Sequence, residues 1–475
     1  MKDRIAVVLI GALLQTVLWL GVLQIDPFGM SSAADRASES IFLKLYSYVY
    51  PSLSSAAARH QIVVVLLDEA DLPKGSDDKR PKVEWPIPRT TYGQLLHKIL
   101  EMKPKSVFLD ILFDTNAGGN GGRPLLDAIP RGSPPVIFAS YARCWRNCSQ
   151  APKLVPSLQS LPTIRAGQPP PESRSYRAVV QVNALPSHYP LYDNTGGIPH
   201  ANAFTPAAAL YDRLRPSPSD RNRWSPPDEM LIAWGSTLPA SFRQSSNQFP
   251  AKCTKVFDDW PGRFYGFGRA VLIGMFNQWF SDPNADGEWN KLQPCEYHTN
   301  ISANLFFKPL NADMEGALRR LVYGSYIFIG TKVAGTGDRV VSPVSGTVPG
   351  VEAHAMAFDN LLEFQGAPIR VSQTLASLIQ AVLIFIALVA GEFLFAGAPH
   401  PETRGDALGK LLTRIGTWLG FGLATAVILL FLLMVFRLAP YNWGGVFSVA
   451  GAAFLPGVER QILILLIGKR QSMEV

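Results

Sequence analysis

Apolar residues are spread unevenly along the chain, with long runs near both ends and an ordinary mixture between them. The first run, Ile5 to Leu23, contains only one Gln and one Thr and is long enough to cross the hydrocarbon core of a bilayer. Lys2 and Arg4 precede it, which favours a cytoplasmic N-terminus. The alternative is a signal peptide cleaved near residues 31–34, but its apolar region would be unusually long. We therefore expect an uncleaved transmembrane helix over residues 1–25.

Three further apolar runs lie near the C-terminus, within residues 371–475. They are Thr374 to Phe395, Ile415 to Phe436 and Trp443 to Ile467. Each is long enough to span a bilayer, so the sequence predicts four transmembrane helices in all. Basic residues gather in the loop at 398–414 and in the tail after Gly468. Because short cytoplasmic loops are enriched in Lys and Arg, both segments should be cytoplasmic.

The last apolar run contains two charged residues, Glu459 and Arg460. Charges within a membrane span are costly and usually face the interior of a helix bundle. These two either reach the interface or make a polar contact with Gln380, with Glu392 or with a partner's membrane helix. They are therefore candidate intramembrane polar residues.

Residues 26–370 combine strand and helix patterns. Apolar strands are predicted at Ile62 to Asp68 and at Ser106 to Asp114, with a helix at Thr90 to Met102 between them. Such apolar strands suit a parallel sheet covered on both faces, and strand–helix–strand is a right-handed βαβ unit by default. Further strands are predicted at 135–140, 230–234 and 270–274, and a helix at 202–215; residues 141–197 and most of 242–310 are interpreted as loops. We therefore predict an α/β extracytoplasmic domain with a largely parallel sheet flanked by helices.

The stretch from Tyr326 to Leu362 connects this domain to the closing membrane runs. It begins with an apolar strand and continues through a segment dense in Gly and Pro, which is typical of a loop. After Gly350 it ends in a short helix with an apolar face.

Acidic residues follow or flank the predicted strands. In open α/β sheets, ligands bind beyond the carboxyl ends of the strands, where carboxylates can hold a hard cation such as calcium or a polar ligand. The alternative is that the carboxylates cap helices or pair with nearby arginines. The candidate ligand-binding residues at this edge are Asp68, Arg89, Asp110, Asp114, Asp338 and Arg339.

His354 follows Gly350 by one helical turn. One interpretation is a packed histidine bonded to a carboxylate. The other is a pH-sensitive switch or a ligand contact, because an unperturbed imidazole titrates near pH 6.5. His354 is therefore added to the candidate ligand-binding residues.

The cysteines all lie in the central region. They are Cys144, Cys148, Cys253 and Cys295. An even count in a region expected to be exported predicts disulfides, with Cys144 paired to Cys148 and Cys253 to Cys295. A metal site is the alternative, but the spacing lacks the paired C-x-x-C form.

Charge and local motifs exclude several classes of function. The net charge of +7 is modest for 475 residues and is not gathered with aromatic residues, so no nucleic-acid partner is expected. No local nucleophile motif such as G-x-S-x-G is found. We predict no catalytic residues, no cofactor and no metal, and we expect that the chain is not an enzyme. An extracytoplasmic enzyme using Asp68, Asp110 and Asp114 is the remaining alternative.

The two ends of the central domain resemble a known family. The opening residues are Val63 to Asp68, then Trp85-Pro86-Ile87-Pro88-Arg89 with Tyr92 and Leu95, then Val107 to Phe113. Together they resemble the start of a CHASE domain of the second type, an extracytoplasmic sensory domain of bacterial histidine kinases, nucleotide cyclases and serine/threonine kinases. The stretch from Tyr326 to Leu362 resembles the closing block of that domain, a strand ending in Gly, a loop carrying Asp, and a Pro-Gly-Val-Glu-x-His helix. Three closing spans usually follow this domain.

The chain departs from that family in two respects. The family usually has an arginine after an Asp-rich turn, whereas Asp193 to Gly197 is followed here by Ile-Pro-His. In addition, no cytoplasmic output domain is expected after the last span. The resemblance transfers no catalytic residues.

The resemblance and the membrane runs together imply a multi-pass protein of the bacterial inner membrane with a large periplasmic domain. We expect that domain to detect a ligand or partner, and the membrane helices to signal to a separate cytoplasmic or membrane effector. Self-association into a homo-oligomer is left open. The alternative is a structural or assembly component of a membrane complex.

Overall fold

The computed structural model describes residues 2–25, 39, 42–43, 46–47, 57–68, 87–113, 122–141, 156–165, 175–180, 188–192, 203–214, 224, 227–235, 297–332, 338–342, 346–370, 373–395, 404–439, 446 and 449. The chain divides into two compact units. One comprises Met1–Phe42 and Val371–Val475, and the other Leu43–Arg370.

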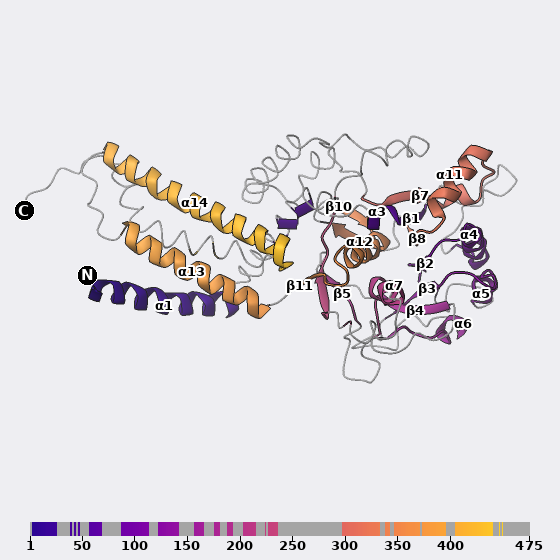
Figure 1. The fold of residues 1–475 in the computed structure, drawn as a ribbon, viewed down its shortest axis with the longest axis horizontal. Helices are drawn as coiled ribbons and strands as arrows, with labels where there is room; N and C mark the ends of the chain where they lie inside the picture. The colour runs from indigo at the N-terminus through magenta and orange to yellow at the C-terminus, as the bar shows by residue number, and fades with distance from the viewer. Residues whose placement is uncertain are drawn as a thin grey trace, which may run out of the picture. The chain divides into compact units, whose positions relative to one another are not determined.

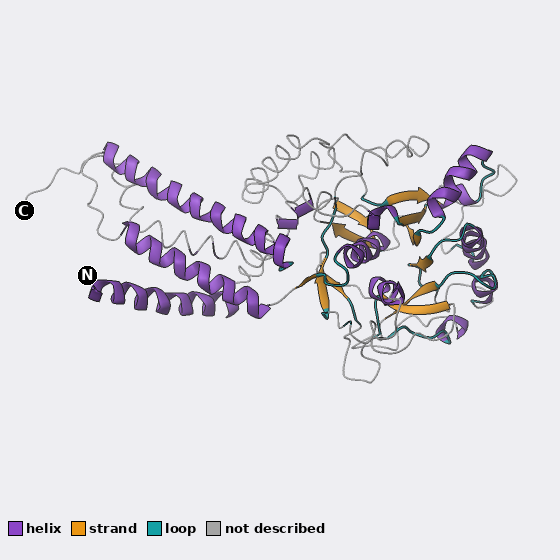
Figure 2. Ribbon diagram, in the orientation of Figure 1, coloured by secondary structure: helices purple, strands orange, loops and turns teal. Residues whose placement is uncertain are grey.

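The larger unit is built on a six-stranded sheet in which every pairing is parallel (Figure 1, Figure 2). In spatial order the strands are β4 (Ser175–Val180), β3 (Val136–Tyr141), β2 (Ser106–Leu109), β8 (Tyr326–Thr331), β1 (Ile62–Leu67) and β7 (Thr299–Ser302). β8 comes late in the chain yet lies between β1 and β2, and every residue of these three strands is buried. The predicted α/β fold with a largely parallel sheet is confirmed.

The two faces of the sheet are covered by different helices. Successive side chains of a strand point to opposite faces, so an apolar strand can fill two cores at once. Val63 and Ile327 face a core that also contains Leu96, from α4 (Arg89–Glu101), and Leu318, from α11 (Ala312–Val322). On the other face Phe328 packs on α12 (Gly350–Glu363), against which α7 (Pro206–Leu214) also packs.

Shorter elements complete this unit. The helices are α3 (Ala57–His60), α5 (Arg123–Asp127), α6 (Pro156–Gln159) and the 3-10 helix η3 (Ala303–Phe306). β5 (His188–Pro190), β6 (Glu229–Leu231) and β11 (Ile369–Arg370) form a three-stranded antiparallel sheet, and β9 (Arg339–Ser342) pairs with β10 (Gly346–Pro349).

Several segments interpreted as loops contain strands, and those interpretations were wrong. β4 and β5 lie in residues 141–197, β7 lies in 242–310, and the β9–β10 hairpin lies within the Gly- and Pro-rich segment before α12. β4 and β7 are the two outermost strands of the sheet and are only partly buried, so they lack the continuous apolar pattern of β1. The strand predicted at 270–274 lies outside the described residues.

The smaller unit contains the long apolar helices α1 (Lys2–Ile25), α13 (Gln373–Phe395) and α14 (Arg404–Phe436). α1 packs against α13, and Ala387 of α13 packs with Trp418 and Phe421 of α14. α14 begins earlier than predicted, so the basic residues from Arg404 onward lie on its first turns and not in a loop.

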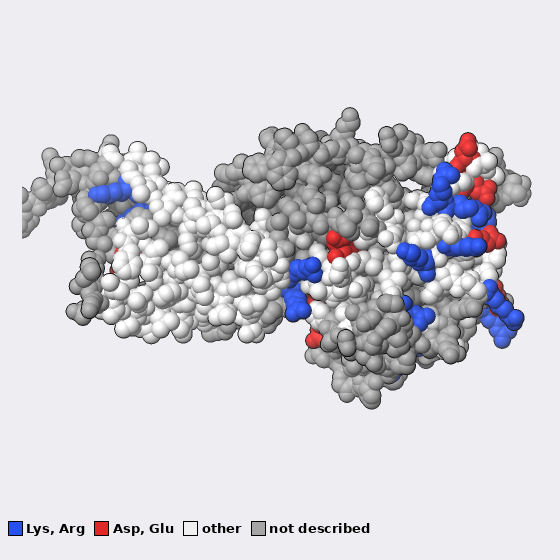
Figure 3. All heavy atoms as spheres, viewed as in Figure 1, with Lys and Arg blue, Asp and Glu red and all other residues white. Residues whose placement is uncertain are grey.

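The described residues contain two helices long and apolar enough to cross a membrane, not the four predicted. Their apolar segments are Ser377–Leu394 and Leu408–Leu433, and the apolar part of α1, Ile5–Gly21, is shorter. Residues 443–467 lie outside the described residues except for positions 446 and 449. Figure 3 shows that α13 and α14 are nearly free of charge over most of their visible surface. Because apolar side chains such as Leu423 are 64% exposed there, these helices present a surface suited to lipid.

Candidate functional site

Asp110 leaves the carboxyl end of β2 and turns into the interior. Its backbone N–H donates to the carbonyl of Ile329 on β8 at 2.8 Å, which continues the parallel ladder by one residue. Only 9% of the residue is exposed, and its Oδ2 forms no hydrogen bond. A negative charge on this oxygen is costly, because the oxygen is buried and accepts no hydrogen bond.

His354 reaches Asp110 from α12. The helix begins after Pro349, whose fixed φ suits a helix start, and it is buried along almost its whole length. His354 Nε2 lies 3.5 Å from Oδ2 of Asp110, and Nδ1 lies 2.7 Å from the hydroxyl of Tyr189 on β5. The Tyr189 oxygen also accepts the backbone N–H of Ala207 at 3.3 Å. We therefore assign the Tyr189 hydroxyl as donor to Nδ1, which leaves the proton of a neutral imidazole on Nε2, facing Asp110.

Asp338 lies at the N-terminus of α12. The backbone N–H of Gly350 donates to the Asp338 carbonyl at 3.1 Å, and a Cβ at position 350 would overlap the Asp338 carboxyl oxygen Oδ1. Any residue other than glycine would therefore displace the Asp338 carboxyl from the first turn of the helix. The positive end of a helix dipole favours an anion at such a place.

We call Asp110, Tyr189, Asp338 and His354 the buried acidic cluster. Burial raises the pKa of Asp110 to about 7. Burial, and then the charge of Asp110, raises the pKa of Asp338 to about 7, against the opposing effect of His354. Burial lowers the pKa of His354 to about 4, and the charge of Asp338 only partly offsets this. Burial also raises the pKa of Tyr189, so its hydroxyl stays protonated.

These shifts change which group titrates near neutral pH. A charged His354–Asp110 pair and a neutral pair contain the same number of protons, and burial favours the neutral one. Near pH 7 the imidazole is therefore neutral, and the two carboxyls gain or lose the protons. The sequence left two interpretations of His354 open, and its burial beside the Asp110 carboxyl agrees with a packed histidine rather than with an imidazole that titrates near pH 6.5.

The other predicted site residues are placed as follows. Asp68 follows β1 and is half-buried, Arg89 begins α4 and is buried, and Arg339 begins β9 with an exposed side chain. The exposed Arg339 is thus not part of the buried acidic cluster. Asp114, the four cysteines, Glu459 and Arg460 lie outside the described residues, as do the disulfides and the intramembrane contact predicted from them.

Tyr189 is the member of the cluster that the sequence did not indicate. It lies in a Pro- and Ser-rich region, on a three-residue strand without a detectable period. Its role depends on a partner 165 positions away in the sequence, so no local pattern identifies it.

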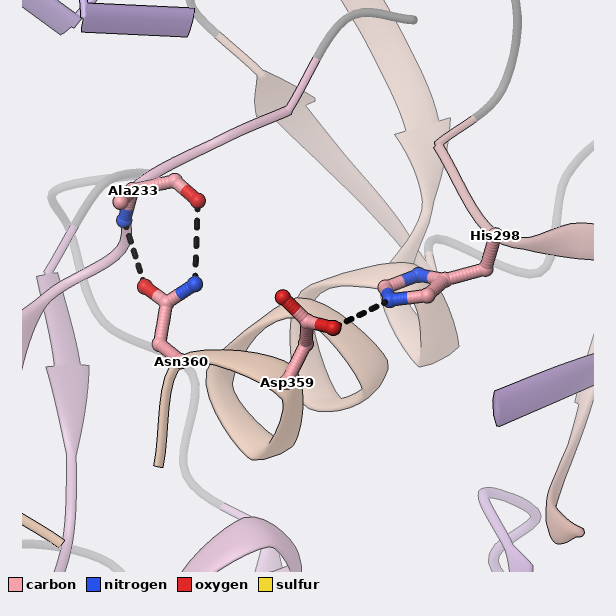
Figure 4. A network of polar contacts seen from close by, with 4 residues as sticks. All are labelled: Ala233, His298, Asp359 and Asn360. Atoms are coloured by element: carbon pink, nitrogen blue, oxygen red, sulfur yellow. Dashed lines mark hydrogen bonds and ion pairs between the residues drawn. The ribbon is translucent and has the colours of Figure 1, made fainter. Parts of the chain in front are cut away.

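A second polar network holds the opposite end of α12. His298 Nε2 lies 3.7 Å from Oδ1 of Asp359, and both side chains are almost fully buried (Figure 4). Asn360 accepts from the backbone N–H of Ala233 at 2.7 Å and donates to its carbonyl at 3.1 Å. Near the start of the helix, Asn300 of β7 donates to Glu352 at 2.9 Å. α12 is therefore bound by polar contacts to both β7 and the segment after β6.

Among the described residues, no group of three or more His, Cys, Asp and Glu side chains is arranged to hold a metal ion. The buried acidic cluster offers proton-exchanging groups and hydrogen-bonding atoms at the carboxyl edge of a parallel sheet.

The fold and this site define an α/β domain joined in one chain to apolar helices of membrane-spanning length. A family profile described as the CHASE2 domain matches residues 9–392, which is most of the chain. The protein therefore belongs to the CHASE2 domain family, as the resemblance at the two ends of the domain suggested. CHASE2 domains are extracellular sensor domains. Comparison with curated proteins and with solved structures gives no match.

Proposed function

We propose that this protein is a sensor subunit of the bacterial inner membrane, with its α/β domain in the periplasm. The domain detects a stimulus at the buried acidic cluster, and the membrane helices signal to a separate cytoplasmic or membrane effector. The supporting observation is the position of His354 on α12. α12 ends at Glu363 and α13 begins at Gln373, so only nine residues connect the helix that carries the site to a candidate membrane span. A shift of α12 therefore has a short covalent path to the membrane.

The proposal includes four spans with both termini in the cytoplasm. It rests on the apolar run after residue 442 and on the basic residues near Arg404 and Lys469. Reporter fusions after Pro250 and after Val475 test this topology. Alkaline phosphatase is active only in the periplasm, and a fluorescent protein is chosen that folds only in the cytoplasm. The fusion after Pro250 should report the periplasm, and the fusion after Val475 the cytoplasm. Fusions that place both positions on the same side of the membrane would refute this topology and the sensor function with it.

The effector is tested by cross-linking the tagged full chain in native membranes and recovering bound proteins. We expect a membrane or cytoplasmic partner that remains bound in the Asp110→Asn variant while its activity changes. Asp313→Asn is the matched control, because Asp313 is exposed on α11 and loses the same charge. Failure to recover any partner under any stimulus tested would count against a signalling subunit.

The alternative is a structural or assembly component, and the extensive polar attachment of α12 favours a rigid scaffold. It predicts that the partner binds and functions equally with wild type and Asp110→Asn. A change in partner activity without loss of assembly would exclude it. In both proposals the chain itself is not an enzyme and uses no cofactor.

A further inference from the structure

We propose that the stimulus read by the buried acidic cluster is the proton: loss of a proton from the Asp110–Asp338 carboxyl pair loosens the β9–β10 hairpin from the start of α12. This inference rests on the proposed sensor function, since it identifies the stimulus of the same site.

The packing around His354 favours a proton over a larger ligand. The ring of His354 contacts the ring of Phe108 edge-on at 5.3 Å between centroids and that of Tyr189 at 5.4 Å. Its two nitrogens face Asp110 and the Tyr189 hydroxyl. Asp110 Oδ2 is buried without a hydrogen bond, and a proton neutralises that oxygen without requiring space.

Among the described residues, the charged groups on neighbouring elements have partners or are exposed, and the buried Arg89 at the start of α4 has interactions of its own. β1 has only apolar side chains, β8 contains no Asp, Glu, His, Lys or Arg, and β10 has no ionisable residue. On β5, His188 pairs with Glu229, and on α12, Glu352 accepts from Asn300. On α7, Arg213 donates to Tyr176, and the neighbouring residues Tyr211 and Asp212 have their own interactions. Asp68 after β1 also has interactions of its own, while Arg339 of β9 and His60 of α3 are exposed.

Ionisation of the two carboxyls affects the β9–β10 hairpin, because Asp338 adjoins that hairpin. Asp338 immediately precedes β9, and β10 runs directly into α12 at Gly350. The carbonyl of Asp338 accepts from Gly350, so the two ends of the hairpin meet at the residue that carries one of the two carboxyls. Two negative charges in a medium of low dielectric constant repel strongly. Of the two acids Asp338 is the less buried, so it relieves the repulsion by moving outward with the hairpin.

The two carboxyls titrate near neutral pH, which is the range that a periplasmic pH sensor would detect. Burial raises the pKa of both carboxyls to about 7, so the cluster is neutral in mild acid and becomes negative as the pH rises through neutrality. His354, whose pKa burial lowers to about 4, stays neutral throughout and does not cancel that charge.

The test is hydrogen–deuterium exchange of the full chain in lipid nanodiscs, between about pH 5.5 and pH 8.5, with rates corrected for intrinsic exchange. Amides of the two hairpin strands, residues 339–342 and 346–349, should lose protection as the pH rises through about 7, by up to roughly tenfold per pH unit if one proton is linked to opening. Amides of α4 provide the internal reference. Wild-type protection of the two hairpin strands that stays constant over this range overturns the inference.

Two variants assign the transition to the carboxyl pair. Asp338→Asn should keep the hairpin protected at high pH and flatten the profile, whereas Asp110→Asn should weaken the transition and move it to lower pH, because Asp338 keeps the part of its pKa shift that burial causes. Asp313→Asn should leave the wild-type profile unchanged. If Asp110→Asn does not fold, Asp338→Asn still decides, because Asp338 lies at the edge of the hairpin and is only partly buried. A transition that persists unshifted in Asp338→Asn overturns the inference.

The outcome also separates this inference from the sensor function. A pH-dependent hairpin without any effect on a bound partner supports the proton switch and refutes signalling. A partner that responds to another stimulus while the two hairpin strands stay protected at every pH supports the sensor and refutes the proton as its signal.

Discussion

Replacing Asp110 by Asn should stabilise the protein at alkaline pH. The pKa of Asp110 rises from 3.8 to about 7 in the folded state, so the folded protein retains a proton that the unfolded chain releases between those values. The contribution of Asp110 to the free energy of unfolding is therefore complete below about pH 4 and is lost as the pH rises through 7. At 1.36 kcal/mol per pKa unit, the cost of ionising Asp110 in the folded protein reaches ~4 kcal/mol at high pH. Asn has nearly the same shape and no charge, so it avoids that cost.

The net gain in the Asp110→Asn variant should be smaller than the full cost, because the contact with His354 is altered. We expect the variant to be about as stable as wild type near pH 4 and ~2–4 kcal/mol more stable at pH 8.5. Since 1 kcal/mol shifts the melting temperature of a large domain by roughly 2–4 °C, the melting curves should separate by several degrees.

The assay is thermal unfolding of the α/β unit within the full chain in nanodiscs, followed by near-UV circular dichroism from about pH 4 to pH 8.5. The difference between the variant and wild-type curves reports the loss of the Asp110 charge, including the effect of that charge on the pKa of Asp338. His354 contributes to both curves, and its lowered pKa makes stability rise between about pH 4 and pH 6.5, which is opposite in sign to the effect of Asp110. Asp313→Asn should give a flat difference. If Asp110→Asn is no more stable than wild type at pH 8.5, the assignment of a buried, uncompensated carboxylate is wrong.

Three further substitutions test the surroundings of the site. Gly350→Ala should destabilise the protein by about 1–3 kcal/mol, because its Cβ overlaps the Asp338 carboxyl, and melting curves unchanged from wild type would contradict that contact. Asn360→Ala should lower the free energy of unfolding by about 2–4 kcal/mol, since it removes two hydrogen bonds and leaves both backbone groups of Ala233 unpaired in the interior. Denaturant unfolding measures this loss. Asn360→Asp should restore only part of it, because a carboxylate can accept from the N–H but cannot donate to the carbonyl. His354→Gln should destabilise the protein by more at pH 7 than at pH 4.5, because below about pH 6.5 the unfolded wild-type chain binds a proton at His354 that the folded protein does not. Parallel stability–pH curves for His354→Gln and wild type would show that folding does not lower the pKa of His354.

Residue pattern was sufficient for the centre of the fold. β1, β2 and β8 are continuous apolar runs, because each strand is buried on both faces, and α4 shows a regular apolar face. The outer strands β4 and β7 are paired on one side only in the described sheet, so their sequences are mixed and were taken for loops. The long apolar helices were also evident in composition, although the described residues include two of spanning length and not four.

The residues of the site were partly visible in the same way. Asp110, Asp338 and His354 stand where a strand ends, where a loop carries an acid, and one turn into a helix, and each position was recognised from its neighbours in the chain. The sequence did not show that these residues lie close together. Their proximity depends on β8 inserting between β1 and β2, which brings α12 beside β2.

The ionisation of the cluster is decided wholly by tertiary structure. A pKa shift arises from lost water and from charges brought near in space, and neither quantity is carried by local sequence. The amino-acid order specified which elements form and which side chains are ionisable. Folding decided that Asp110 is dehydrated, that Tyr189 binds His354, and that the carboxyls rather than the imidazole exchange protons near neutrality.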